Sequence, residues 1–185
     1  STPVGGVLGR IVVAASDDSP ILDPSVPVTL AGATEDGLNL PSGAVGTLVT
    51  ALANAANVAD TDGANAHDGS APGPTGIAIV GADTTRGNWW YSLDNGASWA
   101  LFAGPSLPAM STGHALHLVA DANTRIYFQP TVPNFNGALP VALSYRAWDR
   151  SDGVTNGTLS ALPSGPLGSG TLTDAAAHSS AVAQI

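Results

Sequence analysis

The sequence predicts a mainly β protein, an antiparallel β-sandwich with one short helix and long loops. Short apolar segments recur between residues 76 and 148, and each is bounded by turn-forming Gly, Pro, Asn or Asp. No repeated helical pattern separates these segments, which favours antiparallel strands over βαβ units. The chain has 185 residues, 44% of them apolar, so we expect one core and a single domain over residues 1–185.

The first part of the chain carries the weakest signals. Residues 1–24 form an N-terminal segment with one short apolar run at 11–14. A second apolar run, 26–31, leads to a turn at Asp36-Gly37. The sequence starts without the basic and apolar regions of a signal peptide, and we expect the domain to be a monomeric unit within a longer chain.

One short helix is predicted between Ser42 and Asn57. Apolar residues recur there at intervals of three and four, at Val45, Leu48, Leu52 and Ala55. Pro41 and Ser42 are residues typical of a helix start, and Asn57 is typical of a helix end. We expect this helix to cover one end of the sandwich.

The central part of the chain predicts six strands, at 76–80, 88–93, 98–102, 114–120, 125–129 and 140–148. Asn95-Gly96 between two aromatic strands predicts a hairpin. A second hairpin is expected at 121–124, because apolar residues alternate on both sides of it. Residues 151–174 are rich in Gly and Ser, and they form either an ordered binding loop or a flexible excursion before a weak last strand at 181–183.

The charge pattern excludes several classes of partner. The net charge is −9, with five scattered Arg and no Lys, so the chain lacks the clustered cations that bind nucleic acid or anionic membranes. The sequence contains no run of 18 apolar residues, the length that a membrane-spanning helix needs. Cys is absent, which leaves neither disulfides nor thiolate metal sites.

The acidic residues predict calcium sites. All but one of the 14 are Asp, whose short carboxylates suit loops that hold a hard cation. The densest group lies in the segment 60–74, and two further groups lie where strands meet loops. The candidate ligands are Glu35, Asp36, Asp60, Asp62, Asp68, Asp149 and Asp152. The alternative is that these residues cap solvated turns without an ion. The spacing of an EF-hand is absent.

Histidine and tryptophan are assigned to structure rather than to chemistry. His114 and His117 are three apart in one strand, so they point to opposite faces, and we expect two partly exposed side chains and no zinc site. Trp89 and Trp90 also point to opposite faces. Core packing is the expected role of the tryptophans at positions 99 and 148.

No catalytic pattern is present, and we expect a binding protein rather than an enzyme. There is no nucleophile elbow and no phosphate-binding loop. A ligand site is predicted where the 60–74 loop meets the segment that follows the last central strand. The candidate contacts are Trp148, Arg150, Ser151, Asp152, Gly153 and Asn156. There a calcium ion and an Arg would bind a ligand carboxylate together. The alternative is that Asp149 and Asp152 only brace the strand end.

An ordered series of segments resembles the cadherin-like, calcium-binding domains of bacterial repeats-in-toxin (RTX) adhesins. The match spans about residues 30 to 158, and its pieces are Glu35-Asp36, Asp60–Gly63, Gly76–Ile79, Gly87–Trp99, Thr124–Pro130 and Arg146–Asp149. The series is most similar to the peptide-binding type. The resemblance implies a secreted, cell-surface domain that needs calcium and binds a peptide or protein on a target cell, or a glycan. A calcium-stiffened structural extender and a carbohydrate-binding module are the alternatives.

Overall fold

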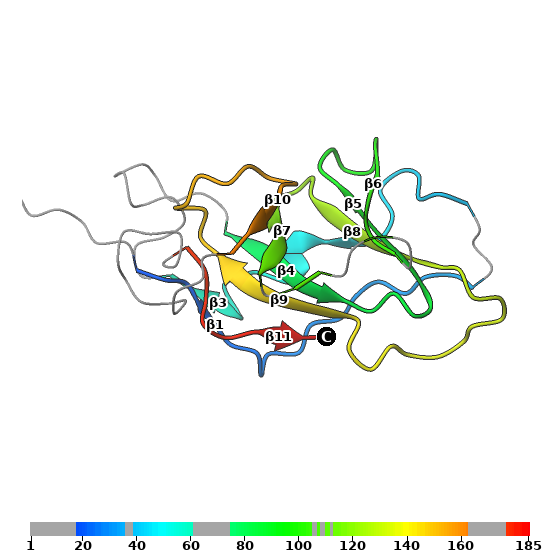
Figure 1. The fold of residues 1–185 in the computed structure, drawn as a ribbon, viewed down its shortest axis with the longest axis horizontal. Coiled ribbons are helices and arrows are strands. Elements are labelled where there is room, and N and C mark those ends of the chain that lie inside the picture. Colours follow the sequence, from blue (N-terminus) through cyan, green and yellow to red (C-terminus); the bar gives the residue numbers. More distant parts are fainter. Residues whose placement is uncertain are drawn as a thin grey trace, which may run out of the picture.

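The computed structural model describes residues 18–35, 39–60, 75–104, 107, 110–111, 113–162 and 177–185. It is mainly β, and two antiparallel sheets pack face to face (Figure 1). The predicted fold class is therefore confirmed. The apolar run at 11–14 and most of the 60–74 loop lie outside the described residues. Within the described part of the chain, no helix is long and apolar enough to cross a membrane.

The larger sheet has five strands in the order β10-β7-β4-β9-β11, with every neighbouring pair antiparallel. Its strands are β4 (Gly76–Ala82), β7 (His114–Val119), β9 (Leu143–Trp148), β10 (Leu159–Ala161) and β11 (Ala183–Gln184). β4 is the central strand, so it contacts a neighbour on each side along most of its length.

The second sheet has four strands in the order β2-β8-β5-β6. They are β2 (Thr47–Leu48), β5 (Gly87–Ser92), β6 (Ala100–Ala103) and β8 (Arg125–Pro130). A separate pair joins β1 (Ile21–Leu22) to β3 (Val58–Ala59), and the one described helical element is a 3-10 turn, η1 (Val49–Ala51).

The main core lies between the two sheets and follows from the alternation of each strand. Ile77 and Ile79 of β4 point inward and are fully buried. In the facing sheet, Trp89 of β5 packs on its cross-strand neighbour Phe128 of β8, with ring centroids 4.9 Å apart. Trp90 is half-buried instead, and its indole N–H donates to Gln129 Oε1 at 3.0 Å. The predicted opposite orientation of the two tryptophans is confirmed.

The outer face of the five-stranded sheet is also covered. Ala78 and Val80 of β4 form a small buried cluster there with Leu162, and Trp148 packs with Val119 and Ala177. Trp148 is fully buried, as expected, whereas Trp99 is only half-buried, against Tyr127. The sheet is thus covered on both faces, whereas antiparallel sheets commonly leave one face in contact with solvent.

The predicted helix at 42–57 is wrong. Gly46 has a φ of +71°, outside the helical region, and the next two residues pair with β8. Only the 3-10 turn remains. Its first residue, Val49, and the residue that follows it, Leu52, are both buried. Of the four residues whose spacing suggested the helix, Leu52 is buried and Leu48 half-buried, whereas Val45 and Ala55 are exposed, so the spacing of three and four does not mark one buried face.

The hairpin at Asn95-Gly96 is confirmed, because β5 and β6 pair antiparallel around it. The predicted hairpin at 121–124 is wrong, since β7 and β8 belong to different sheets. The turn itself exists, and Asp121 Oδ1 accepts the backbone N–H groups of Asn123 and Thr124. The apolar run at 26–31 is not a strand, and the last strand lies at β11, close to its predicted position.

A pair of glycine variants tests the packing of the first hairpin. A Cβ at Gly96 would lie 1.9 Å from the carbonyl oxygen of Gly43, whereas a Cβ at Gly43 would meet nothing within 4 Å, although both glycines have positive φ. We expect Gly43→Ala to lower the free energy of unfolding by about 1 kcal/mol, from the left-handed backbone alone. Gly96→Ala adds the clash, for a total of about 3 kcal/mol. Equal losses in urea unfolding would contradict the contact between these two turns.

Candidate functional site

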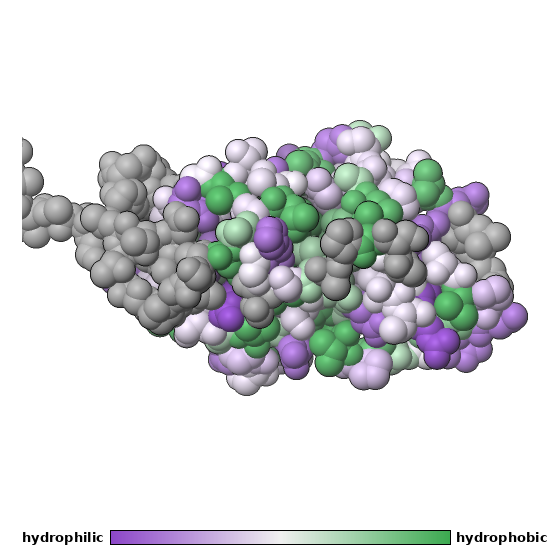
Figure 2. Space-filling view, viewed as in Figure 1, coloured by the Kyte–Doolittle hydropathy of each residue, from purple (hydrophilic) through white to green (hydrophobic). Residues whose placement is uncertain are grey.

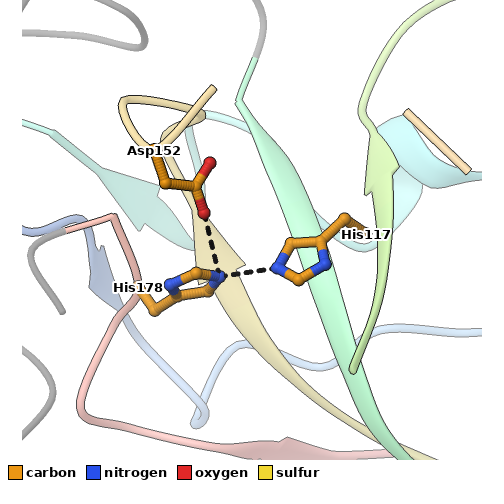
Figure 3. Close-up of side chains that lie close together, drawn as sticks. All are labelled: His117, Asp152 and His178. Carbon is orange, nitrogen blue, oxygen red and sulfur yellow. Dashed lines mark hydrogen bonds and ion pairs between the residues drawn. The ribbon is translucent and has the colours of Figure 1, made fainter. Parts of the chain in front are cut away.

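Three side chains that can bind a metal meet on the outer face of the five-stranded sheet. His117 comes from β7, Asp152 from the turn after β9, and His178 from the segment that precedes β11 (Figure 3). The two Nε2 atoms are 2.8 Å apart, and Asp152 Oδ2 lies 3.9 Å from His178 Nε2. All three ligand atoms lie within 4.8 Å of one another, and no other such group of three occurs among the described residues.

The central strand makes room for these rings with small residues. Ala78 lies between His117 and Arg146 in the ladder, and Gly76 lies beside Trp148. A Cβ at Gly76 would come within 2.6 Å of the Trp148 ring. The small outward residues of β4 therefore leave space for the Trp148 ring against the sheet. There the ring contacts His117, with ring centroids 4.9 Å apart.

The backbone of the C-terminal segment is fixed over the sheet by hydrogen bonds. One guanidinium nitrogen of Arg146 donates to the carbonyl oxygens of Ser179 and Ser180, at 2.8 and 2.6 Å. The backbone N–H of Asp149 donates to the carbonyl of Ala177 at 3.1 Å. His178 is held between these anchors, which explains why its side chain is only 1% exposed.

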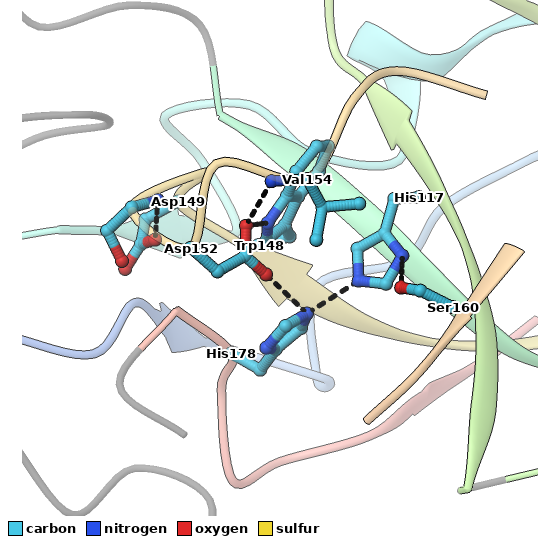
Figure 4. Close-up of polar contacts among 8 residues, drawn as sticks. His117, Trp148, Asp149, Asp152, Val154, Ser160 and His178 are labelled. Atoms are coloured by element: carbon cyan, nitrogen blue, oxygen red, sulfur yellow. Dashed lines mark hydrogen bonds and ion pairs between the residues drawn. The ribbon is translucent and has the colours of Figure 1, made fainter. Parts of the chain in front are cut away.

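The carboxylate of Asp152 is oriented by two donors on one oxygen. Oδ1 accepts the indole N–H of Trp148 and the backbone N–H of Val154, each at 3.0 Å (Figure 4). Oδ2 is thereby turned toward His178. The side chain is only 2% exposed, so its charge acts on the two imidazoles rather than on solvent.

His117 is held in the uncharged form. Burial lowers its pKa to about 4, and His178 adds to this shift, while Asp152 opposes it. Its Nδ1 lies 3.3 Å from the Ser160 hydroxyl. Because 2.8 Å separates the two Nε2 atoms, one of them must carry the proton that the other accepts.

Two imidazole nitrogens and one carboxylate oxygen are ligands typical of zinc and related transition metals. Calcium takes six to eight oxygens, so this cluster is not a calcium site. Sequence reasoning missed it because His117 and His178 are 61 residues apart. We expected both strand histidines to be partly exposed. His114 is exposed, but His117 is only 1% exposed, so the expectation is wrong for His117. The apolar neighbours of His117 within β7 were the available signal of burial.

The predicted calcium ligands are spread over the molecule. Asp36, Asp62 and Asp68 lie outside the described residues. Asp149 is 1% exposed, at the end of β9, and its Oδ1 accepts the backbone N–H of Ser151 at 2.8 Å. The carboxylate oxygens of Asp60 are also hidden from solvent.

Glu35 lies at the other end of the sandwich from Asp149. It lines a cavity of about 690 Å³ together with Ala142 and Ile185, beside the first residue of β9. Six residues of strand span about 20 Å, so Glu35 and Asp149 cannot bind one ion together.

The predicted ligand contacts fall into two groups. Trp148 and Asp152 are buried and bonded to each other, and Asn156 is also engaged, because its amide accepts the N–H of Val119 and donates to Thr124. Arg150, Ser151 and Gly153 lie nearer the surface. Arg150 has a φ of +75° and forms no ion pair with any described residue.

A second cavity, of about 520 Å³, opens between the edges of the two sheets. Leu101 of β6, Leu159 of β10 and Met110 are among its lining residues. Figure 2 shows apolar side chains on this side of the molecule, over β6, β7 and β10. The linings of this cavity and of the cavity at Glu35 do not include the predicted ligand contacts.

Comparisons with known proteins return no match to the chain among family models, curated proteins or solved structures. The geometry of the described residues therefore carries the functional argument.

The buried imidazole of His117 predicts a pH-dependent stability. An unfolded His has a pKa of about 6.5, so the unfolded chain binds a proton before the folded one does, and stability falls as pH drops through the window from 6.5 to about 4. We expect His117→Gln to remove about 2 kcal/mol of the loss between pH 7 and pH 5, measured by urea unfolding in EDTA. His114→Gln, in the same strand but exposed, is the control and should leave the loss unchanged. The same pH profile for both variants would contradict a buried neutral His117.

Proposed function

We propose that this chain is a calcium-dependent ligand-binding domain of a secreted bacterial surface adhesin. It attaches the cell to host or other cells by binding a peptide or protein terminus. The role is one of binding and not of catalysis. The recognition surface is the turn that follows β9, at Arg150, Ser151 and Gly153, which lie nearer the surface than Trp148 and Asp152.

The observation that carries this proposal is that the residues following two long polar stretches of the sequence, Thr75 and Ala177, both lie beside the end of β9. Residues 61–74 are followed by Thr75, whose carbonyl accepts the N–H of Ala120 and whose neighbour Gly76 pairs with Trp148. Residues 163–176 are followed by Ala177, whose carbonyl accepts the N–H of Asp149. Loops carried on a rigid sheet at one end are the usual place for a binding site.

The charges at this end suit a ligand carboxylate. Arg150 forms no ion pair with the described residues and can donate charge-assisted hydrogen bonds. A net charge of −9 would repel an acidic ligand, and a bound calcium ion would reverse that field locally. Asp149 fits an oxygen ligand for calcium at this end. Most of the six to eight oxygens would come from the 60–74 segment, with Asp60, Asp62 and Asp68.

A binding screen with matched arginine variants tests the location. Metal-free protein, reloaded with Ca²⁺ alone, is screened against peptides with free termini and against glycans. We expect binding to a peptide terminus, weakened at least tenfold by Arg150→Ala, because a charge-assisted hydrogen bond contributes about 1.5–3 kcal/mol. Arg86→Ala is the control, since Arg86 lies over Phe135 at the opposite end. Equal effects of the two variants would refute the location, and binding to glycans alone would favour a carbohydrate-binding module.

A thermal unfolding experiment tests the calcium requirement separately. Carboxylates that face one another without a cation repel, so the metal-free domain should melt at a lower temperature than the same protein with Ca²⁺. At 100 times the dissociation constant, the added stability is about 2.7 kcal/mol. Identical melting curves with and without Ca²⁺ would contradict the proposal that calcium stabilises the domain. A calcium-dependent rise without any ligand in the screen would favour a structural extender.

A further inference from the structure

We infer that His117, His178 and Asp152 form a zinc site that is separate from the calcium sites and fixes the C-terminal segment to the five-stranded sheet. The site requires neither a ligand nor calcium, so it stands apart from the proposed function. Its three ligand atoms are the Nε2 atoms of both histidines and Oδ2 of Asp152.

Two of the three distances between the ligand atoms are close to those of a tetrahedral zinc site, and the third, between His117 Nε2 and Asp152 Oδ2, is within 4.8 Å. Zinc binds nitrogen and oxygen at about 2.0–2.2 Å, which places neighbouring ligand atoms about 3.3 Å apart. The observed separations, 2.8 Å between the imidazoles and 3.9 Å from His178 to Asp152, lie on either side of that value. These two separations must each change by about 0.5 Å, and Asp152 Oδ2 must also come to about 3.3 Å from His117 Nε2 for all three atoms to bind one ion.

The surroundings of Asp152 and His117 match those of known metal ligands. Such ligands are held by a second layer of hydrogen bonds that fixes their orientation. Trp148 and Val154 occupy Oδ1 of Asp152 and leave Oδ2 directed at the histidines. The Ser160 hydroxyl lies beside Nδ1 of His117, which directs Nε2 into the site.

The electrostatics also favour a cation. Asp152 is a buried carboxylate, and among the described residues it has an ion-pair contact with His178, at 3.9 Å. A buried carboxylate is stabilised by a partner of opposite charge. A divalent zinc ion between the three groups would supply that charge and would replace the single shared proton of the histidine pair.

The consequence would be a link between parts of the chain that are distant in sequence. His117 belongs to a strand next to the centre of the sheet, and His178 to the segment that leads into β11, at the edge. Three protein ligands leave one position of a tetrahedral ion for a water molecule or another oxygen. Because the ligands are 1–2% exposed, we expect the ion to stabilise the fold and not to contact solvent freely.

Zinc titration of the whole chain tests the site. Metal-free protein, prepared without a histidine tag, is titrated with Zn²⁺ in excess Ca²⁺ by calorimetry, and one ion per chain is expected. Asp152→Asn keeps an acceptor for Trp148 and Val154 but removes the charge, and His178→Gln removes one nitrogen ligand. Each should weaken zinc binding by at least about 100-fold, beyond the effect of losing an outer hydrogen bond. His114→Gln is the control and should bind as the parent does.

X-ray absorption of the zinc-loaded parent protein keeps the test decisive if the variants fold poorly. A shell containing two imidazoles is the expected result. No zinc uptake by the parent, a shell without imidazole, or unchanged affinity in folded Asp152→Asn and His178→Gln would each overturn the site. In that case the histidines are only a hydrogen-bonded pair in a buried position. None of these outcomes depends on the peptide screen or on the calcium melting curves.

Discussion

The alternation of side-chain size along β4 is the constraint on which the rest of the structure depends. Ile77 and Ile79 point inward and fill the core between the sheets, while Gly76 and Ala78 point outward and leave space. Trp148 occupies that space, and its indole N–H fixes Asp152. The outer face thereby becomes a second, buried layer, in which polar side chains can be oriented without competition from water.

Local pattern was enough to predict the six central strands, but not the short strands β1, β2, β3 and β10, nor which strands are neighbours. Alternation and turn residues place the central strands within a few residues, and Asn95-Gly96 gives the hairpin. Alternation on both sides of the 121–124 turn is equally compatible with a hairpin and with a crossing between sheets, so that prediction failed. The helix failed because an apolar spacing of three and four also arises in a short strand followed by a turn, and Gly46 was the signal against it.

The residues at the end of β9 also show what the sequence can and cannot predict. The sequence indicated Asp149 and Asp152 at the end of β9, and the structure places both there. It gave no sign that His178 would reach His117, because that contact depends on Arg146 holding the C-terminal backbone across the sheet. The same strand end therefore carries both the turn of the proposed ligand site and the buried cluster on the outer face of the sheet, and Asp152 faces the cluster.

Anomalous diffraction from crystals grown with both Ca²⁺ and Zn²⁺, recorded on either side of the zinc absorption edge, tests this account most directly. It predicts a zinc peak between the two Nε2 atoms and Asp152 Oδ2, with the imidazoles moved apart from 2.8 Å to about 3.3 Å. Calcium should occupy different positions, with oxygen ligands, at the end of the sandwich that carries Asp149. A histidine pair still in hydrogen-bond contact in the presence of zinc, with no anomalous peak beside it, would contradict the account.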